Sequence, residues 1–279
     1  MKSMYPSIAI IGSKGYLGSR LLQNLNQFFD NVEGIDQHNL AQLEDCLKRH
    51  EMIIWAAGLS NHELGKQDPW LDMQLNAIDV IRAASHVTNN QTFIHISSTC
   101  IYGNSAGVVD EESQVMPLEP QAYSKFYAEE MLTHIAKIRG FKLLNLRSSA
   151  VVGDKSPGEP LSFLEKILIS DARNEVIEIY GGKQRPCIFT PINDFLGCIK
   201  NLLTVKNWPS HKLNLATHQI NFDNLTDQFK FRFVDSKIRN SLRIENKKWG
   251  LLNLKPKTLT NTLNYLDELQ NELRKRFII

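Results

Sequence analysis

The sequence of 279 residues lacks several features that would place it in a special class of protein. It has four cysteines and no CxxC pair, which argues against a zinc site or a disulfide framework and favours a reducing compartment. No apolar run approaches the roughly 18 residues of a membrane span, and we recognise no secretory leader before the first apolar segment. We therefore expect a cytoplasmic protein that does not enter a membrane.

Charge of either sign is hardly in excess. Lys and Arg total 32 and Asp and Glu total 30, which gives a formal net charge of +2. Nucleic-acid binding needs a marked basic surplus, so we expect no nucleic-acid partner. Basic residues do gather among aromatic ones after about residue 219, where they could contact a nucleotide diphosphate or face solvent.

The eight histidines form no HxxxH pattern, and we expect no metal site. His95 lies in an apolar run that begins at Phe93. A histidine in a buried strand is more often a hydrogen-bonded core residue than a catalytic one. We therefore interpret His95 as part of the core.

The sequence does contain short apolar runs that alternate with helical stretches, and its length suits a nucleotide-binding domain with a smaller appendage. This alternation predicts an α/β fold, a Rossmann-like doubly wound parallel sheet that binds ligands at the C-terminal ends of its strands. The apolar runs cover residues 8–11, 52–58, 93–98 and 142–147, and the helical stretches lie around 39–49, 70–87 and 122–139.

We expect two domains. Residues 1–155 with about 188–215 would form the dinucleotide-binding Rossmann domain, and about 156–187 with 216–279 a smaller C-terminal substrate-binding lobe. The last helical stretch, 259–277, repeats leucine along one face, which indicates a face that docks on the rest of the lobe.

A glycine-rich turn follows the first apolar run, in the stretch SIAIIGSKGYLGSRLLQNL. Its GxxGxxG spacing permits a tight turn, an approach of backbone to a pyrophosphate at a helix N-terminus, and close packing of helix on strand. A glycine-rich turn without a ligand is the alternative. The predicted cofactor-binding residues of this turn are Gly12, Ser13, Lys14, Gly15, Tyr16, Leu17 and Gly18.

Asp36 follows the turn by about 20 residues, where a carboxylate would bind the adenosine ribose of a dinucleotide and repel a 2′-phosphate. This favours NAD over NADP. Lys14 has the opposite effect because a cation could pair with a 2′-phosphate, so NADP stays possible. A helix cap for Asp36 and a solvated surface charge for Lys14 are the alternatives.

Further segments extend the pattern, and with them the chain resembles the extended short-chain dehydrogenase/reductases, the NAD-dependent sugar-nucleotide epimerases, dehydratases and reductases. The resemblance covers roughly residues 5–218 and is faint afterwards, in KWGLLNLKPKTLTNTLNYL. The matching segments, in chain order, are IIGSKGYLG, IIWAAG with QLNAIDVIRAA, FIHISSTCIYG, SKFYAEE, LLNLRSSAVVG, IEIYGGKQRP with INDF, and KLNLAT.

The resemblance implies roles for individual residues. Ser98 would be the catalytic hydroxyl that holds the reacting substrate oxygen, and Lys125 would bind the nicotinamide ribose and tune a neighbouring acid or base. Asn76 matches a structural asparagine of the family. At the end of the apolar run 52–58, Ala56, Ala57 and Gly58 would line the cofactor. The implied substrate contacts are Ser98, Thr99, His62 and Arg185.

One expected residue is absent. The family's YxxxK motif places a tyrosine one helical turn before the lysine, where the ammonium stabilises a phenolate base. Here that position holds Gln121, which cannot ionise. Tyr123 and Tyr127 are each two residues from Lys125 and should face away from it on a helix.

Three interpretations of Gln121 stay open. The protein could be an enzyme in which Ser98 through water, Lys125 or the substrate moves the proton, with Gln121 hydrogen-bonded to substrate. It could instead bind a dinucleotide or sugar nucleotide without turnover, as a sensor or as the partner of an active subunit. It could also be a scaffold that binds neither ligand. We favour the first, an NAD(P)-dependent oxidoreductase or epimerase acting on a nucleotide-linked sugar or similar keto or hydroxy substrate, as a homodimer.

Overall fold

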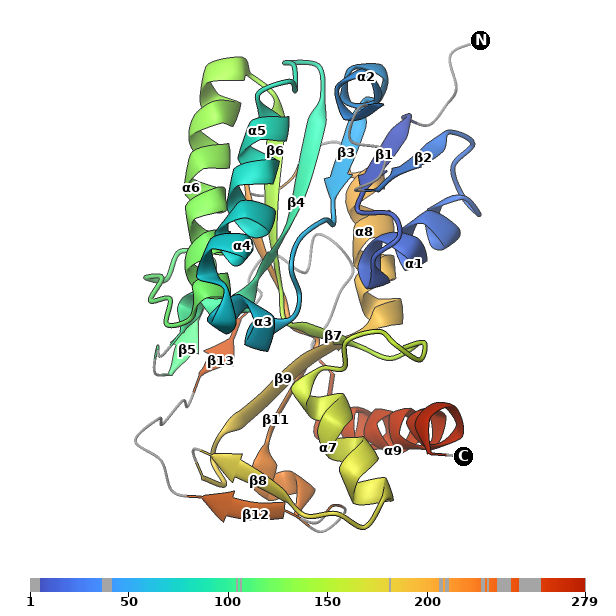
Figure 1. The fold of residues 1–279 in the computed structure, drawn as a ribbon, viewed down its shortest axis with the longest axis vertical. Helices are drawn as coiled ribbons and strands as arrows, with labels where there is room; N and C mark the ends of the chain where they lie inside the picture. The colour runs from blue at the N-terminus through green and yellow to red at the C-terminus, as the bar shows by residue number, and fades with distance from the viewer. Residues whose placement is uncertain are drawn as a thin grey trace. The chain divides into compact units, whose positions relative to one another are not determined.

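The computed structural model describes residues 6–36, 42–103, 105, 107–180, 182–205, 208, 211–226, 229, 231–234, 242–245 and 257–278. The chain divides into two compact units, each assembled from separate stretches of sequence (Figure 1). The first unit comprises Met1–Gly103, Pro117–Arg147 and Ile199–Leu213. The second unit comprises Asn104–Met116, Ser148–Cys198 and Asn214–Ile279.

A six-stranded sheet, nearly all of which lies in the first unit, has the strand order β10-β6-β4-β3-β1-β2. The neighbours β2, β1, β3 and β4 pair in parallel. Every residue of β1 is buried, as expected for a parallel strand with both faces covered. The predicted Rossmann-like sheet is confirmed. Its strands are β1 Ile8–Ile11, β2 Val32–Ile35, β3 Met52–Trp55, β4 Thr92–Ser98, β6 Lys142–Ser148 and β10 Lys212–Leu215.

The strand order contains a switch point. β1 lies between β2 and β3, so the chain moves toward one edge of the sheet after β1 and toward the other edge after β3. Open α/β sheets bind ligands in the crevice at such a point, beyond the carboxyl ends of the strands. The turn after β1 and the segment after β3 therefore meet where a ligand would bind.

Helices cover both faces of this sheet. On one face an apolar cluster joins Ile11 of β1 and Phe93 of β4 to Val80 of α5 and Leu132 of α6. Helix α1 contacts β1 and β2 and buries Leu21. The helices of this unit are α1 Tyr16–Leu25, α2 Leu43–Arg49, α3 His62–Gln67, α4 Pro69–Met73, α5 Asp79–Ala84 and α6 Pro120–Arg139.

Two helical predictions differ from the structure in detail. The stretch around residues 70–87 is interrupted by a π-helical turn, η2 (Gln74–Ile78), which separates α4 from α5. Such turns often accompany functional sites. The stretch around 39–49 is described only from residue 42, where it holds the short helix α2.

Helix α6 shows why its sequence starts and stops where it does. Pro120 occupies the first turn, where its missing N–H would have had no helical partner. Gly140 ends the helix with a φ of 80°, the left-handed conformation typical of a helix C-cap.

The second unit has a core of its own. Helices α7 and α9 pack together, and α9 buries Leu266, Leu269 and Leu273, which confirms the later part of the predicted leucine face. Leu259, the first leucine of that face, is 50% exposed. Residues 248–256 of the faint closing segment 248–266, and most basic residues between 235 and 256, lie outside the described residues. The elements are β5 Val108–Val109, β7 Ala150–Val152, α7 Phe163–Ala172, β8 Ile177–Tyr180, β9 Pro186–Pro191, β11 His218–Asn221, β12 Phe231–Val234, β13 Arg243–Ile244 and α9 Leu259–Phe277.

The strands described in the second unit form three small groups. β9 pairs with β11 in antiparallel and with β7 in parallel orientation. β12 pairs with β8, and β13 pairs with β5. The remaining elements of the described residues are the 3₁₀ turns η3 Thr99–Tyr102 and η4 Phe222–Leu225 and helix α8 Ile192–Thr204. Among the described helices, none is both long enough and apolar enough to span a bilayer.

Candidate active site

The glycine turn between β1 and α1 provides a place for an anion. Gly12 has a φ of 88°, and the N–H groups of Gly12 and Ser13 both donate to the carbonyl of Ile35 on β2. Gly15 is the N-cap of α1, which among the described residues has no side-chain cap and no acidic residue in its first turn. The first backbone N–H groups of α1, which include those of Tyr16 and Leu17, suit a phosphate group.

Packing explains two of the three glycines. A Cβ atom on Gly18 would lie 2.1 Å from the carbonyl oxygen of Gly12, and one on Gly12 would lie 2.6 Å from the Cα atom of Ala57. Separations below about 3 Å are not compatible with a real side chain. The spacing therefore serves both the close contact of α1 with the turn and the contact of the turn with the segment after β3.

Gly18→Ala should disrupt this turn. We expect a loss of folding stability of roughly 1–3 kcal/mol, typical of overpacking, together with weaker dinucleotide binding. Gly197→Ala is the matched control, because Gly197 lies within α8 and a Cβ there would have no atom within 4 Å. Urea unfolding and calorimetric titration with NAD test both variants. Equal NAD affinity in the two variants would contradict the role given to Gly18.

Asp36 and Lys14 form one ion pair. The Lys14 Nζ lies 2.5 Å from the Asp36 carboxylate, and the exposed fractions of the two side chains are 72% and 6%. Asp36 favours NAD and Lys14 favours NADP, and the two side chains contact each other at the end of β2. The lysine is bound to the buried carboxylate and still reaches solvent.

The segment after β3 is held by a set of amide bonds around Leu59. The Asn76 side chain accepts from the Leu59 N–H at 3.0 Å and donates to the Leu59 carbonyl at 3.1 Å. The Gln121 Nε2 donates to the same carbonyl at 2.8 Å. Asn76 comes from the π turn η2 and Gln121 from the first turn of α6. The Gln121 side chain therefore holds the backbone of the segment after β3 at Leu59. This contact was not predicted from the sequence.

Gly58 brings this segment close to Lys125. A Cβ atom on Gly58 would lie 2.4 Å from the Asn76 Oδ1 and 3.5 Å from the Lys125 Nζ. The N–H of Ala56 donates to the Ile11 carbonyl, which keeps the start of the segment against β1. The predicted cofactor-lining residues, the glycine turn and Lys125 therefore converge within the first unit.

Lys125 is buried, and its ammonium donates to the carbonyl of Ile96 on β4 at 2.9 Å. Burial lowers its pKa to about 8, although the charges of Asp72 and Glu129 oppose that change. A lysine with a pKa near neutrality can both give and accept a proton under physiological conditions. The site retains a titratable group even though Gln121 replaces the expected phenol.

Ser98 is the last residue of β4. Its Oγ accepts a hydrogen bond from the Cys100 N–H at 3.2 Å, and a hydroxyl that accepts one bond still has a proton to donate. Thr99 follows as the first residue of η3 and is buried. Burial raises the pKa of the Cys100 thiol to about 11, although the charge of nearby Lys125 opposes that change.

The two nearby tyrosines do not substitute for the missing one. Tyr123 is 54% exposed and Tyr127 is 45% exposed, whereas Lys125 between them is buried. The prediction that both tyrosines face away from Lys125 is confirmed. Their exposure on α6 is compatible with an interface between subunits, and the expected homodimer stays a prediction.

A buried ion pair supports the helix that carries Lys125. The Arg147 guanidinium of β6 donates to the Glu129 carboxylate of α6, with an Nη2–Oε2 distance of 2.7 Å and an Nε–Oε2 distance of 3.0 Å. Ser97 and Tyr102 complete the group by bonding to Glu129 and Arg147 respectively. Both charged side chains are at most 1% exposed. Sequence reasoning missed the role of Arg147, and a single charge in the apolar run LLNLRSS was the available signal.

His95 lies in the core, as predicted. Its Nδ1 pairs with the Asn145 Oδ1 of β6 at 3.0 Å, and its Nε2 has no hydrogen-bond partner among the described residues. Burial and the Lys125 charge lower its pKa to about 3, so the ring is neutral. A neutral ring inside the sheet has no access to a substrate.

The remaining predicted substrate residues lie in other surroundings. His62 opens α3, is half exposed, and has its Nδ1 3.4 Å from the Oε2 of Glu119, which also pairs with Lys66. Arg185 belongs to the second unit, where it donates to the Tyr180 carbonyl and lies over the Phe163 ring. Their contacts with a substrate stay predictions.

Comparison with known proteins extends this description. The family model described as the NAD dependent epimerase/dehydratase family matches residues 8–204. The chain is 24% identical over 235 residues to an uncharacterized UDP-glucose epimerase, YtcB, of Bacillus subtilis (strain 168), covering 72% of this chain and 73% of that protein. It is 23% identical over 240 residues to a putative UDP-glucose 4-epimerase of Methanocaldococcus jannaschii, covering 75% and 76%.

Solved structures share the fold at low identity. MoeE5 in complex with UDP-glucuronic acid and NAD has a TM-score of 0.81 at 20% identity, over 96% of this chain and 99% of that one. The UDP-glucuronic acid 4-epimerase from Bacillus cereus in complex with NAD has a TM-score of 0.78 at 17% identity, over 97% and 99%.

Proposed function

Because the chain belongs to the NAD dependent epimerase/dehydratase family, we propose that it uses NAD to oxidise, reduce or epimerise a carbon of a nucleotide-linked sugar. The observation that carries this proposal is the buried Lys125, with a pKa lowered to about 8, beside the Gly58 backbone. The names of the curated relatives make UDP-hexoses the first substrates to test.

The residues present fit a dinucleotide. The uncapped start of α1 would hold the pyrophosphate, Asp36 the hydroxyls of the adenosine ribose, and Lys125 the nicotinamide ribose. The buried Asp36 carboxylate favours NAD. Lys14 on that carboxylate leaves NADP as the second dinucleotide to test. When bound, NAD supplies the hydride acceptor and donor.

The side chains would then carry out the proton transfer. Ser98 would donate a hydrogen bond to the reacting sugar oxygen, and the neutral amine of Lys125 would accept the hydroxyl proton as the carbon loses its hydride. Lys125 would later return that proton to the sugar oxygen. Gln121 cannot ionise and would keep the segment after β3 in place through the Leu59 carbonyl. We therefore expect slow turnover relative to an enzyme with a tyrosine at this position.

Gln121→Tyr tests this division of roles. A phenol one helical turn before Lys125 should raise kcat toward UDP-hexoses by up to roughly 10²- to 10⁴-fold, the usual contribution of a positioned acid or base. Gln121→Phe is the matched control, because it has the same ring without the hydroxyl. Product formation with NAD and UDP-glucose or UDP-glucuronic acid, followed by mass spectrometry and chromatography, measures the effect. A rise in both variants, or a fall in Gln121→Tyr alone, would contradict the proposal.

One observation favours a second candidate function. The Gln121 Nε2 donates its hydrogen bond to the Leu59 carbonyl, and an amide cannot act as an acid or base. A protein that binds its ligands without turning them over needs no acid or base at this position. In that case the wild-type protein would bind NAD and a UDP-sugar but form no product, and only Gln121→Tyr would have activity. Measurable wild-type turnover that Lys125→Met removes would exclude this second candidate.

A further inference from the structure

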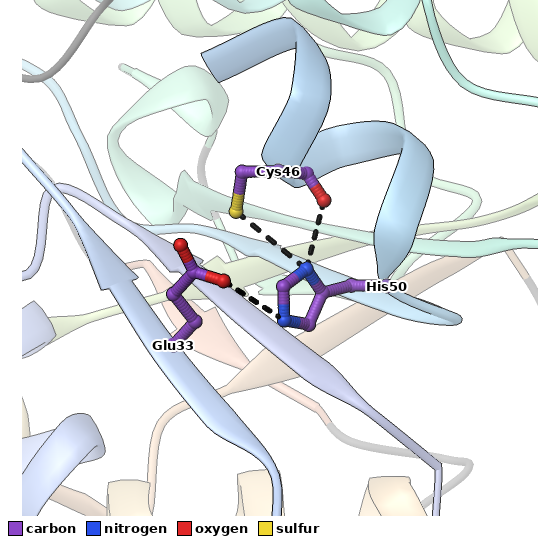
Figure 2. Close-up of side chains that lie close together, drawn as sticks. All are labelled: Glu33, Cys46 and His50. Carbon is purple, nitrogen blue, oxygen red and sulfur yellow. Dashed lines mark hydrogen bonds and ion pairs between the residues drawn. The ribbon is translucent and has the colours of Figure 1, made fainter. Parts of the chain in front are cut away.

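Three side chains of metal-binding types come together at the edge of the first unit, away from Lys125. They are Glu33 on β2, Cys46 on α2 and His50 directly after α2, and one ligand atom from each, with either ring nitrogen counted for His50, lies within 4.8 Å of the others. Figure 2 shows the Cys46 sulfur and the Glu33 carboxylate both turned toward the His50 ring. Cys46 is fully buried, His50 is 4% exposed and the Glu33 side chain is 32% exposed. The cluster therefore opens to solvent on its carboxylate side.

The hydrogen bonds of His50 determine which nitrogen can act as a ligand. The Nδ1 lies 2.8 Å from the backbone carbonyl of Cys46, and a carbonyl can only accept, so Nδ1 carries the proton. The Cys46 sulfur lies 3.6 Å from the same nitrogen. A histidine that donates its other N–H to a backbone carbonyl is the usual arrangement of a metal ligand, because that bond orients the ring.

The second nitrogen faces an acceptor. The His50 Nε2 lies 3.4 Å from the Glu33 Oε2, and with Nδ1 protonated a neutral ring would direct a lone pair at a carboxylate. Two such groups repel unless a positive charge lies near them. Arg49 supplies one such charge at the other oxygen of Glu33, and a cation between the two groups would supply another. The separation exceeds the roughly 2.7–3.2 Å of a good hydrogen bond.

Although the spacing of the cysteines and histidines predicts no metal site, we propose that Glu33, Cys46 and His50, which only the fold brings together, form a site for a divalent transition-metal ion, with zinc as the best match. A thiolate, an imidazole nitrogen and a carboxylate are the three ligand types that zinc accepts in proteins, and four-coordinate zinc would leave one position for water on the exposed Glu33 side. The ion would link β2 to α2, the two elements on either side of Asp36 in the chain.

Arg49 is the local opposing charge. Its guanidinium lies 3.2 Å from the other oxygen of Glu33, and its side chain is 60% exposed. An exposed arginine can move toward solvent, so it weakens the attraction for a cation without blocking the site. The site does not depend on the proposed reaction, because none of its ligands contacts Lys125, Ser98 or the glycine turn in the hydrogen bonds of the described residues.

The test is metal binding by the full-length protein after removal of metal with a chelator. Calorimetric titration with Zn²⁺ measures stoichiometry and affinity, and Co²⁺ absorption reports whether a thiolate is bound. We expect one ion per chain with a thiolate-to-cobalt charge-transfer band. Cys46→Ser should abolish that band and weaken binding by more than the roughly 10- to 100-fold that loss of an outer-shell partner causes. Cys198→Ser, which also alters a buried thiol, should bind like the wild type.

Glu33→Gln provides a second variant, because its partly exposed side chain can lose its charge without disturbing the core. It should also weaken Zn²⁺ binding, with circular dichroism as the check that each variant is folded. The proposal fails if the wild-type protein binds no Zn²⁺. It also fails if Co²⁺ binds without the thiolate band, or if Cys198→Ser loses binding as Cys46→Ser does.

Discussion

Lys125→Met is expected to stabilise the folded protein at pH 7 by as much as about 3 kcal/mol while lowering turnover by roughly 10²- to 10⁴-fold. The stabilising effect follows from burial: the pKa of Lys125 falls from 10.5 to about 8 because the folded chain holds the ammonium away from water. Methionine fills a similar volume without a charge. A residue that reduces stability but supports activity is a mark of function rather than of structure.

The pH dependence gives the sign of this effect. Below pH 8 Lys125 is charged in both the folded and the unfolded chain, so the cost of burying the charge is present in full. Between about pH 8 and pH 10.5 the folded chain loses the proton first, so the stability of the wild type rises relative to that of Lys125→Met. The advantage of the variant should therefore be largest at pH 7 and small near pH 10.

Urea unfolding of both proteins at these two pH values measures the difference, and kcat with NAD and a UDP-hexose measures the loss of activity. Lys142→Met is the control for removing a lysine, since Lys142 is exposed on β6. A stability difference that does not change with pH would show that the ammonium is not the cause. Unchanged turnover in Lys125→Met would remove this residue from the proposed mechanism.

Glu129→Gln is expected to have the opposite effect on stability, a loss of roughly 3–5 kcal/mol. The substitution keeps the shape of the side chain but leaves the Arg147 guanidinium buried without its counter-charge. Despite burial, the hydrogen bonds and charge of Glu129 raise the pKa of Arg147, so the guanidinium stays ionised in the folded chain. Removing one member of a buried pair is costly because the other charge is then unpaired.

A double-mutant cycle separates the interaction energy of Glu129 with Arg147 from the contributions of their surroundings. Glu129→Leu combined with Arg147→Met replaces both charges by apolar groups, and it should restore much of the stability that each single substitution removes. Ser97→Ala is the milder control, because it removes one hydrogen bond to Glu129 and should cost about 1 kcal/mol. Additive losses in the double variant would show that Glu129 and Arg147 do not act as a pair. Equilibrium unfolding in urea measures the free energy of unfolding of each variant.

Much of the fold could be predicted because it depends on local patterns. The limits of β1 match the predicted apolar run, β3, β4 and β6 overlap theirs, and α9 matches the predicted final helix. A parallel strand buried on both faces produces a continuous apolar run, and an amphipathic helix repeats its leucines, so both can be read from neighbours in sequence. The glycine turn was predictable for the same reason.

The interruption of the predicted helix near Asn76 was not predictable. The π turn at Gln74–Ile78 aims Asn76 at Leu59, which lies 17 residues away in sequence. Helical propensity averaged over that stretch does not contain this contact. A tertiary hydrogen bond can alter local helix geometry because it stabilises one orientation of a side chain.

The sequence by itself determined the α/β fold, the glycine turn, the family resemblance, and the presence of a glutamine where a tyrosine was expected. Only the tertiary structure decided what several of these residues do: Gln121 bonds to Leu59 across 62 positions, Lys14 is paired with Asp36, and Glu33 meets Cys46 and His50. The physical reason is range. Propensities and periodicities describe neighbours along the chain, whereas pKa values, ion pairs and ligand sets depend on distances of a few ångströms between residues that only folding brings together.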